Sequence, residues 1–205
     1  KISDLMGATI CVNSGTTTEL NVADYFASRK LKYRLLAFEK SDEVVKAYER
    51  GRCDAYTTDH SGLYANRMKL TNPSEHEILP GSISREPLGP AVRHGDNHWA
   101  DVVRWTLFTL LSGELHNITQ ENISKLKKTA VKPEIKRMLG IIPSNDGLHL
   151  SVDWAYQVLK QVGNYKEIYD RNLGTGSKLK IERIANRLWK HGGLHYPCLL
   201  YTSPS

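Results

Sequence analysis

The sequence has no long apolar run, few cysteines and no nucleotide-binding loop. Its longest nearly apolar stretch, Trp105 to Leu111, is far shorter than the ~20 residues that a membrane-spanning helix needs, and the mean hydropathy of −0.44 agrees. The three cysteines form no Cys-x-x-Cys pair, so a zinc or dithiol redox motif has no support. Neither G-x-x-x-x-G-K-[ST] nor G-x-G-x-x-G occurs, which argues against phosphate-loop and dinucleotide-binding proteins.

The composition is that of a globular protein with a basic second half. Hydrophobic residues make up 40% of the 205 residues, enough for an apolar core. Residues 1–100 carry 13 basic and 13 acidic side chains, whereas residues 101–205 carry 15 and 9. The densest basic run, 125–137, contains no interleaved aromatic residues and is interrupted by Pro133. We interpret it as a solvent-exposed helix face and expect no nucleic-acid partner.

The first 70 residues alternate between strand and helix signals. β-Branched and apolar residues predict strands over 8–13, 33–38 and 53–58. The segments between and after them predict three helices. The first ends at about Lys30 and has Leu20, Ala23, Phe26 and Ala27 on one face. The second covers 42–50 with Ser41 as its N-cap, and the third covers about 61–69. This βαβαβα order predicts a parallel sheet with right-handed crossovers.

The pattern changes in the second half. Ile78-Leu79 and Ala91-Val92-Arg93 predict two further short strands. After His98 almost no strand signal remains. Helices are predicted over 99–111, 119–128, 134–139, 151–162, 164–172 and 178–190. A helical block of this length usually covers a sheet, and no such sheet is evident in this chain.

The loop Ser14-Gly15-Thr16-Thr17 joins the first predicted strand to the first predicted helix. Free backbone N–H groups and the positive end of the helix dipole converge at such a loop, so it can bind an anion. Equally, Thr16 or Thr17 can be an N-cap and Gly15 a turn residue.

Asp59 follows the third predicted strand as Ser14 follows the first. In a doubly wound sheet these strands are neighbours, and ligands bind beyond their carboxyl ends. A carboxylate and an anion-binding helix terminus would then lie side by side, spaced for the ammonium and carboxylate of an α-amino acid. Taken alone, Asp59 is more simply the N-cap of the following helix.

Several separate blocks resemble the substrate-binding proteins of polar amino acid ABC transporters, and are most similar to the general L-amino acid-binding group. The blocks are Gly7 to Glu19, Gly51 to Gly62, Glu86 to Arg93, Val103 to Leu107, and Asp153 onward to Gly174. The resemblance implies an α/β fold: a type II periplasmic binding protein-like lobe with a parallel-rich sheet, followed by a mainly helical segment of an incomplete first lobe.

The resemblance also implies a division of the chain. Residues 1–6 would be a remnant of the crossover from lobe one, and 7–90 a complete lobe two. Residues 91–196 would hold the return crossover and the C-terminal helices of lobe one, whose N-terminal part has no counterpart here. Residues 197–205 depart from the family pattern, and we interpret them as a non-native tail.

By resemblance, the ligand-binding residues are those of the two loops: Asn13, Ser14, Gly15, Thr16, Thr17, Thr58 and Asp59. The implied function is capture of L-amino acids in the periplasm for ABC-transporter permease subunits, by a protein that is monomeric at full length. No cofactor, metal or catalytic residue is implied. The family's arginine clamp on the ligand carboxylate has no counterpart here, so we expect this chain alone to bind weakly or not at all.

Two other function classes remain open at this point. One is a periplasmic dehydratase-like enzyme on the same fold, which would need a general acid in the cleft; Glu19 and Asp59 are the acidic residues near the predicted site. The other is the ligand-binding domain of a sensor. A disulfide between Cys11 and Cys53 is geometrically allowed, but adjacent parallel strands disfavour it, so we expect two buried thiols.

Overall fold

The computed structural model describes residues 1–143 and 147–198. The chain divides into two compact units, Lys1–Leu88 and Gly89–Ser205, and each is described by itself. Within the described residues, none of the helices has both the length and the apolarity that crossing a membrane requires. The tail expected over 197–205 lies mostly outside the described residues.

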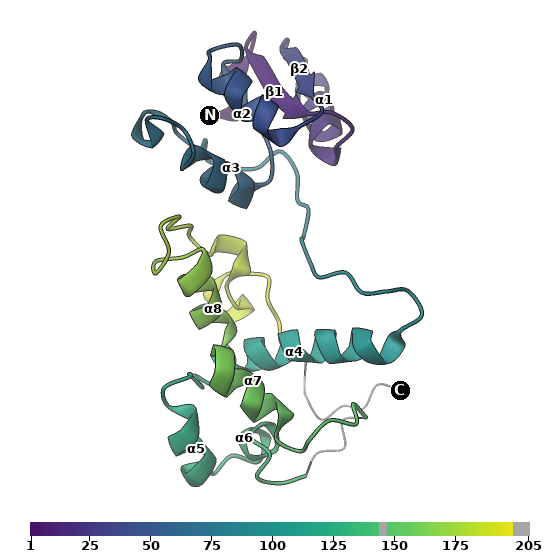
Figure 1. Ribbon diagram of the computed structural model, residues 1–205, viewed down its shortest axis with the longest axis vertical. Coiled ribbons are helices and arrows are strands. Elements are labelled where there is room, and N and C mark those ends of the chain that lie inside the picture. Colours follow the sequence, from purple (N-terminus) through teal and green to yellow (C-terminus); the bar gives the residue numbers. More distant parts are fainter. Residues whose placement is uncertain (144–146, 199–205) are drawn as a thin grey trace. The chain divides into compact units, whose positions relative to one another are not determined.

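The first unit is built on a three-stranded parallel sheet. Its strands are β1 (Thr9–Asn13) and β2 (Arg34–Phe38), both labelled in Figure 1, and β3 (Ala55–Tyr56), in the order β2-β1-β3. This confirms the prediction that the first and third strands are neighbours. β3 is shorter than the predicted 53–58, although backbone bonds from Asp54 to Thr9 (2.8 Å) and from Thr57 to Cys11 (3.1 Å) continue its pairing with β1 on both sides.

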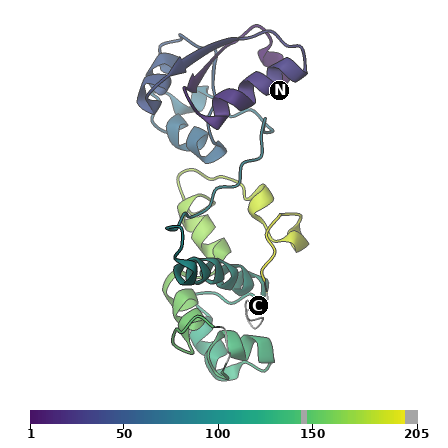
Figure 2. The ribbon, with the colours of Figure 1, turned by 90° about the vertical axis from the view of Figure 1, so that its right-hand side faces the viewer.

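Helices cover both faces of this sheet (Figure 2). Because successive strand residues point to opposite faces, Ile10 packs with Val22 and Phe26 of α1 (Thr17–Ser28), whereas Cys11 packs with Val44 and Ala47 of α2 (Ser41–Glu49). The other helical elements of the unit are α3 (His60–Arg67), η1 (Ile2–Leu5) and η2 (Pro73–Glu75). All three predicted helices are therefore present.

Two details of these helices were predicted wrongly. The buried side of α1 is formed by Val22 and Phe26, while Leu20 is 66% exposed and Ala27 is also exposed. Leu20 lies roughly 200° around the helix from Val22, so both cannot face the sheet. Ser41 is the first residue of α2 rather than its N-cap; Lys40 holds the cap position without a side-chain bond.

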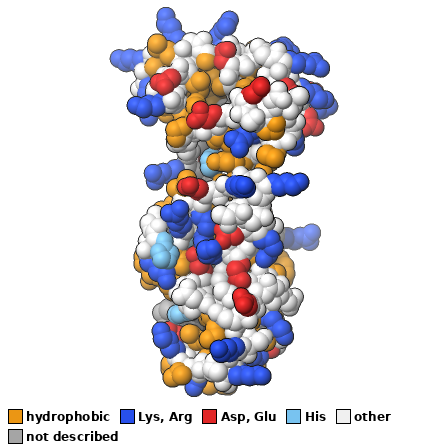
Figure 3. All heavy atoms as spheres, turned by 90° about the vertical axis from the view of Figure 1, so that its left-hand side faces the viewer, with side chains coloured by type: hydrophobic (Ala, Val, Ile, Leu, Met, Phe, Trp, Pro, Cys, Tyr) orange, Lys and Arg blue, Asp and Glu red, His pale blue; other side chains and the backbone are white. Residues whose placement is uncertain are grey.

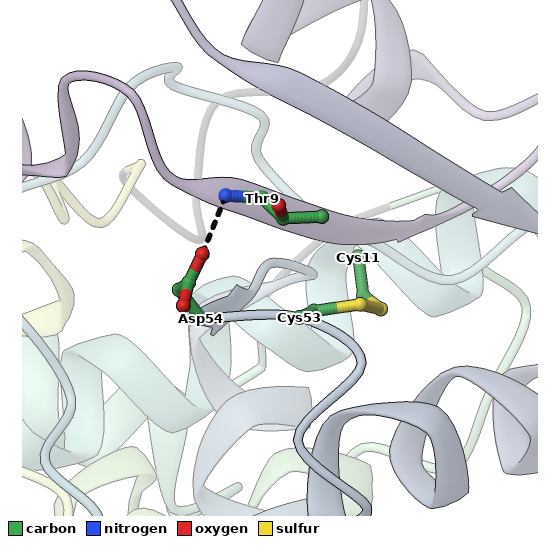
Figure 4. Close-up of a disulfide and its surroundings, with 4 residues drawn as sticks. All are labelled: Thr9, Cys11, Cys53 and Asp54. Carbon is green, nitrogen blue, oxygen red and sulfur yellow. Dashed lines mark hydrogen bonds between the residues drawn. A yellow bond between two sulfur atoms is a disulfide. The ribbon is translucent and has the colours of Figure 1, made fainter.

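The two cysteines of the first unit form a disulfide, which corrects the expectation of free thiols (Figure 4). Cys11 lies in β1 and Cys53 just before β3, and their Cα atoms are 5.7 Å apart. Cys53 is not opposite Cys11 in the ladder, since Tyr56 holds that position, so the disulfide joins two residues that are out of register. Beside it, the Asp54 carboxylate accepts a 2.7 Å hydrogen bond from the Thr9 amide.

The second unit is helical. It contains α4 (Asn97–Leu115), α5 (Ile123–Thr129), α6 (Pro133–Met138), α7 (Trp154–Val162) and α8 (Tyr165–Asn172), with η3 (Ile184–Asn186) and η4 (Trp189–His191) (Figure 1). Its main buried cluster joins residues from several of these helices and the loops between them: Ile118, Ile123, Met138, Leu139, Ala155, Tyr156 and Leu159. The first five predicted helices of this half are thus confirmed.

Three expected elements are absent. Residues 178–190 do not form one helix, because Lys180 and Ile184 have φ angles of 50° and 34°, which are incompatible with a right-handed helix. Ile78-Leu79 and Ala91–Arg93 are not strands. A strand needs a hydrogen-bonded neighbour, and among the described residues no strand is paired with either segment.

On the face shown in Figure 3, Lys and Arg side chains occur on both units and are interspersed with acidic and neutral ones. The basic run 125–137 falls on α5 and α6, and Pro133 begins α6. Lys125, Lys128 and Lys132 are exposed, whereas Lys127, Lys136 and Arg137 are partly buried. The interpretation as exposed helix surface therefore holds for only part of the run.

Candidate ligand-binding site

A pocket of about 280 Å³ lies at the carboxyl ends of the three parallel strands of the first unit. All three strands contribute to it: β1 with the turn into α1, β2 with the residue after it, and β3 with the loop into α3. The lining residues are Asn13, Ser14, Thr16, Thr17, Thr18, Glu39, Thr57, Thr58 and Asp59. The structure therefore brings together six of the seven residues predicted from the sequence, all except Gly15.

The amino end of α1 forms one wall of the pocket. Thr16 is the N-cap: its hydroxyl accepts a hydrogen bond from the Glu19 amide at 3.3 Å and donates one to the Asn13 carbonyl at 2.8 Å. The next two amides, of Thr17 and Thr18, belong to the first turn and have no intrahelical acceptor. The N-cap and the anion-site interpretations of this loop are therefore compatible, because the cap leaves two amides available at the positive end of the dipole.

Gly15 has a different position from the one expected. Its amide donates a 2.8 Å hydrogen bond to Oε2 of Glu19, and it is not among the pocket-lining residues. Its φ of +68° is a conformation that glycine adopts at little cost. Gly15 therefore shapes the turn, and its amide already has a carboxylate acceptor within the chain.

Asp59 also belongs to the pocket lining. It occupies the N-cap position of α3, but its side chain accepts no hydrogen bond from the helix, so the capping role that residue type alone favours is not observed. Its exposed carboxylate instead lines the pocket together with Thr58. A Cβ on Gly62 would lie 3.1 Å from Cγ2 of Thr58, which shows how closely Thr58 approaches α3.

Three lining residues were missed by the sequence reasoning: Thr18, Glu39 and Thr57. Glu39 directly follows β2, so the rule that pointed to Asp59, a polar residue just after a parallel strand, would have found it as well. Thr57 and Thr18 adjoin predicted residues. The lining set contains two carboxylates, of Glu39 and Asp59, and no Lys, Arg or His.

A carboxylate outside the lining set fixes the wall formed by α1. Glu86 accepts hydrogen bonds from the Thr17 hydroxyl, at 3.1 Å, and from the Asn21 side-chain amide. The extended segment that ends the first unit is thereby attached to the first turn of α1. Because the hydroxyl proton of Thr17 points to Glu86, the Thr17 oxygen keeps its lone pairs. The Thr17 amide, in the first turn of α1, has no intrahelical acceptor.

Comparison with known proteins gives consistent matches along the chain. The general L-amino acid-binding periplasmic protein AapJ of Rhizobium johnstonii is 54% identical over 94% of this chain and 57% of its own length. The putative amino-acid ABC transporter-binding protein YhdW of Escherichia coli K12 is 49% identical, and the glutamate/glutamine/aspartate/asparagine-binding protein BztA of Rhodobacter capsulatus 41% identical, each over 94% of the chain and 57% of the relative. No protein-family model matches.

A solved structure agrees with these relatives. The ABC transporter periplasmic binding protein of Brucella ovis, determined with glutathione bound, is 51% identical and superposes with a TM-score of 0.91, covering 97% of this chain and 62% of its own. Over the matched region, this chain is similar in sequence and structure to periplasmic binding proteins of amino-acid ABC transporters. The chain spans about 57% of the length of the curated relatives that it matches.

Proposed function

We propose that the chain carries one wall of the ligand site of a periplasmic solute-binding protein, which captures L-amino acids and passes them to the permease subunits of an ABC transporter. The observation that carries this proposal is that the amino end of α1 and the carboxylate of Asp59 line one pocket. These two groups have opposite polarity. An α-amino acid presents a carboxylate and an ammonium on one carbon atom, so one small ligand satisfies both.

In the proposed complex, the ligand carboxylate accepts hydrogen bonds from the Thr17 and Thr18 amides, where the helix dipole favours an anion. The ligand ammonium donates to Asp59 and to the Thr58 hydroxyl. β1 and β3 are paired neighbours, and neighbouring strands lie roughly 4.8 Å apart. The hydrogen-bond partners of an ammonium and a carboxylate on one α-carbon must lie close together, and two loops that follow neighbouring strands can supply such a pair.

The names of the relatives bear on the ligand class. AapJ is named for general L-amino acids, and BztA for glutamate, glutamine, aspartate and asparagine; the Brucella protein was solved with glutathione. The γ-glutamyl end of glutathione carries the same free α-ammonium and α-carboxylate as an amino acid. We therefore propose that recognition of this zwitterion is common to all these ligands, and that the chain acts by binding, without a catalytic residue.

The proposal is tested by titrating the ¹⁵N-labelled chain with L-glutamine and following the backbone amide resonances. We expect dissociation constants in the millimolar range, because this chain supplies one wall of the site, and the largest shifts at Thr17, Thr18 and Asp59. The analogue without the ammonium (the 2-hydroxy acid) and the analogue without the carboxylate (the amine) should each bind at least about tenfold more weakly, since a charge-assisted hydrogen bond contributes about 1.5–3 kcal/mol.

Asp59→Asn should weaken L-glutamine binding by about tenfold or more for the same reason. Asp24→Asn makes the same charge change at an exposed site on α1, outside the pocket lining, and should have little effect. Equal affinities for glutamine and its singly charged analogues, or unchanged binding by Asp59→Asn, would contradict the proposal. Micromolar or tighter binding would contradict the view that this chain supplies only one wall.

A further inference from the structure

The pocket contains a charged group that recognition of the α-amino acid zwitterion does not use, the carboxylate of Glu39. We infer that Glu39 is a specificity-determining residue that selects ligands by the charge of their side chain, favouring cationic or hydrogen-bond-donating side chains and disfavouring carboxylates. This inference rests on the proposed function and concerns the same pocket.

The strand order separates Glu39 from the zwitterion site. Asp59 follows β3, α1 begins after the central strand β1, and Glu39 follows β2, on the other side of β1. Two strand spacings, roughly 9–10 Å, therefore lie between the β2 and β3 ends of the pocket. With the ammonium at Asp59 and the carboxylate at α1, the side of the pocket that remains for the rest of the ligand is the one that Glu39 lines.

The carboxylate of Glu39 is not engaged by another side chain. Among the described residues, Glu39 takes part in no ion pair and no side-chain hydrogen bond, and the pocket lining contains no basic side chain. Two other carboxylates near the amino end of α1 are already engaged: Glu19 by the Gly15 amide, and Glu86 by Thr17 and Asn21. Glu39 is thus the available carboxylate on the β2 side of the lining.

A charge about 6 Å from a ligand group at a solvent-accessible site changes affinity by a few-fold to about tenfold. The effect has opposite signs for cationic and anionic side chains. It is therefore best measured as a ratio between ligands of similar shape: L-lysine against L-norleucine for a cation, and L-glutamate against L-glutamine for an anion. A ratio also removes any general loss of affinity caused by a disturbed pocket.

The test is an NMR titration of the wild-type chain, Glu39→Gln and Glu43→Gln with these four amino acids. Glu43 lies in the first turn of α2, is exposed and does not line the pocket, so it controls for net charge. We expect Glu39→Gln to lower the lysine-to-norleucine affinity ratio and to raise the glutamate-to-glutamine ratio, each by about three- to tenfold. Glu43→Gln should leave both ratios within about twofold of the wild-type values.

Two results would overturn the inference and are distinguishable from failure of the proposed function. If the wild-type chain binds the four amino acids but Glu39→Gln leaves both ratios unchanged, or changes them no more than Glu43→Gln does, Glu39 does not determine specificity and the zwitterion site stands. If the wild-type chain shows no shift with any of the four amino acids, the proposed function fails and this inference fails with it.

Discussion

Different interactions stabilise the interior of each of the two units. The first, Lys1–Leu88, has a short sheet with a small cluster of buried residues on each face, and a disulfide joins Cys11 to Cys53. The second, Gly89–Ser205, has one larger apolar cluster and a buried ion pair between Glu114 and Arg183. The unit that carries the polar pocket is thus the one with a covalent cross-link, and the helical unit depends on packing and on a buried ion pair.

The largest expected effect comes from breaking the buried ion pair of the second unit. Arg183 makes two 2.8 Å hydrogen bonds to the carboxylate of Glu114, and both side chains are no more than 10% exposed. Arg183→Met leaves a buried carboxylate without its partner, which should lower the free energy of unfolding by about 3–5 kcal/mol. Urea unfolding followed by tryptophan fluorescence measures this unit selectively, since all four tryptophans lie between residues 99 and 189.

Arg104→Met is the matched control for that measurement. It removes the 3.0 Å ion pair with Asp101, in which Arg104 is 60% exposed, and exposed pairs contribute less than about 1 kcal/mol. The double variant Glu114→Leu/Arg183→Met should recover part of the loss, because no unpaired charge is then buried. If Arg183→Met and Arg104→Met lower the free energy of unfolding equally, the stability of the second unit does not depend on the buried ion pair.

A somewhat smaller effect is expected from opening the disulfide of the first unit. The two cysteines are 42 residues apart in sequence, and closing a loop of that size stabilises the folded state by about 3–4 kcal/mol. Reduction should therefore increase amide hydrogen exchange in β1 and α2 and leave the tryptophan-detected transition of the second unit unchanged. In the double variant Cys11→Ala/Cys53→Ala, the amide hydrogens of β1 and α2 should exchange fast with or without reductant. Both measurements give a free energy of unfolding. If reduction lowers the value from the tryptophan transition by as much as the value from hydrogen exchange in β1, the disulfide does not stabilise the first unit alone.

Much of the fold followed from local sequence patterns. The alternation of β-branched strands and amphipathic helices over residues 8–69 predicted the parallel sheet and its strand order, because these features depend on residues close together in sequence. The rotation of α1 about its axis did not follow, since Val22 and Leu20 are equally apolar and only the sheet decides between them. The segments at 78–79 and 91–93 failed as strands because a strand exists only with a partner.

The candidate site was largely predictable for a topological reason. Residues that follow parallel strands meet at one edge of a sheet, and Ser14 and Asp59 do so here. The same rule, applied to the second strand, would have added Glu39. Gly15 could not be judged from sequence, because its amide donates to the side chain of Glu19, one helical turn later. The disulfide was missed because its offset from the strand register depends on where β3 begins.

The most direct test is an experimental structure of the chain with L-glutamine bound. The account predicts the ligand ammonium within about 3 Å of the Asp59 carboxylate and the ligand carboxylate within about 3 Å of the Thr17 or Thr18 amide. A ligand bound in the reverse orientation, or at a position that contacts neither α1 nor Asp59, would contradict it.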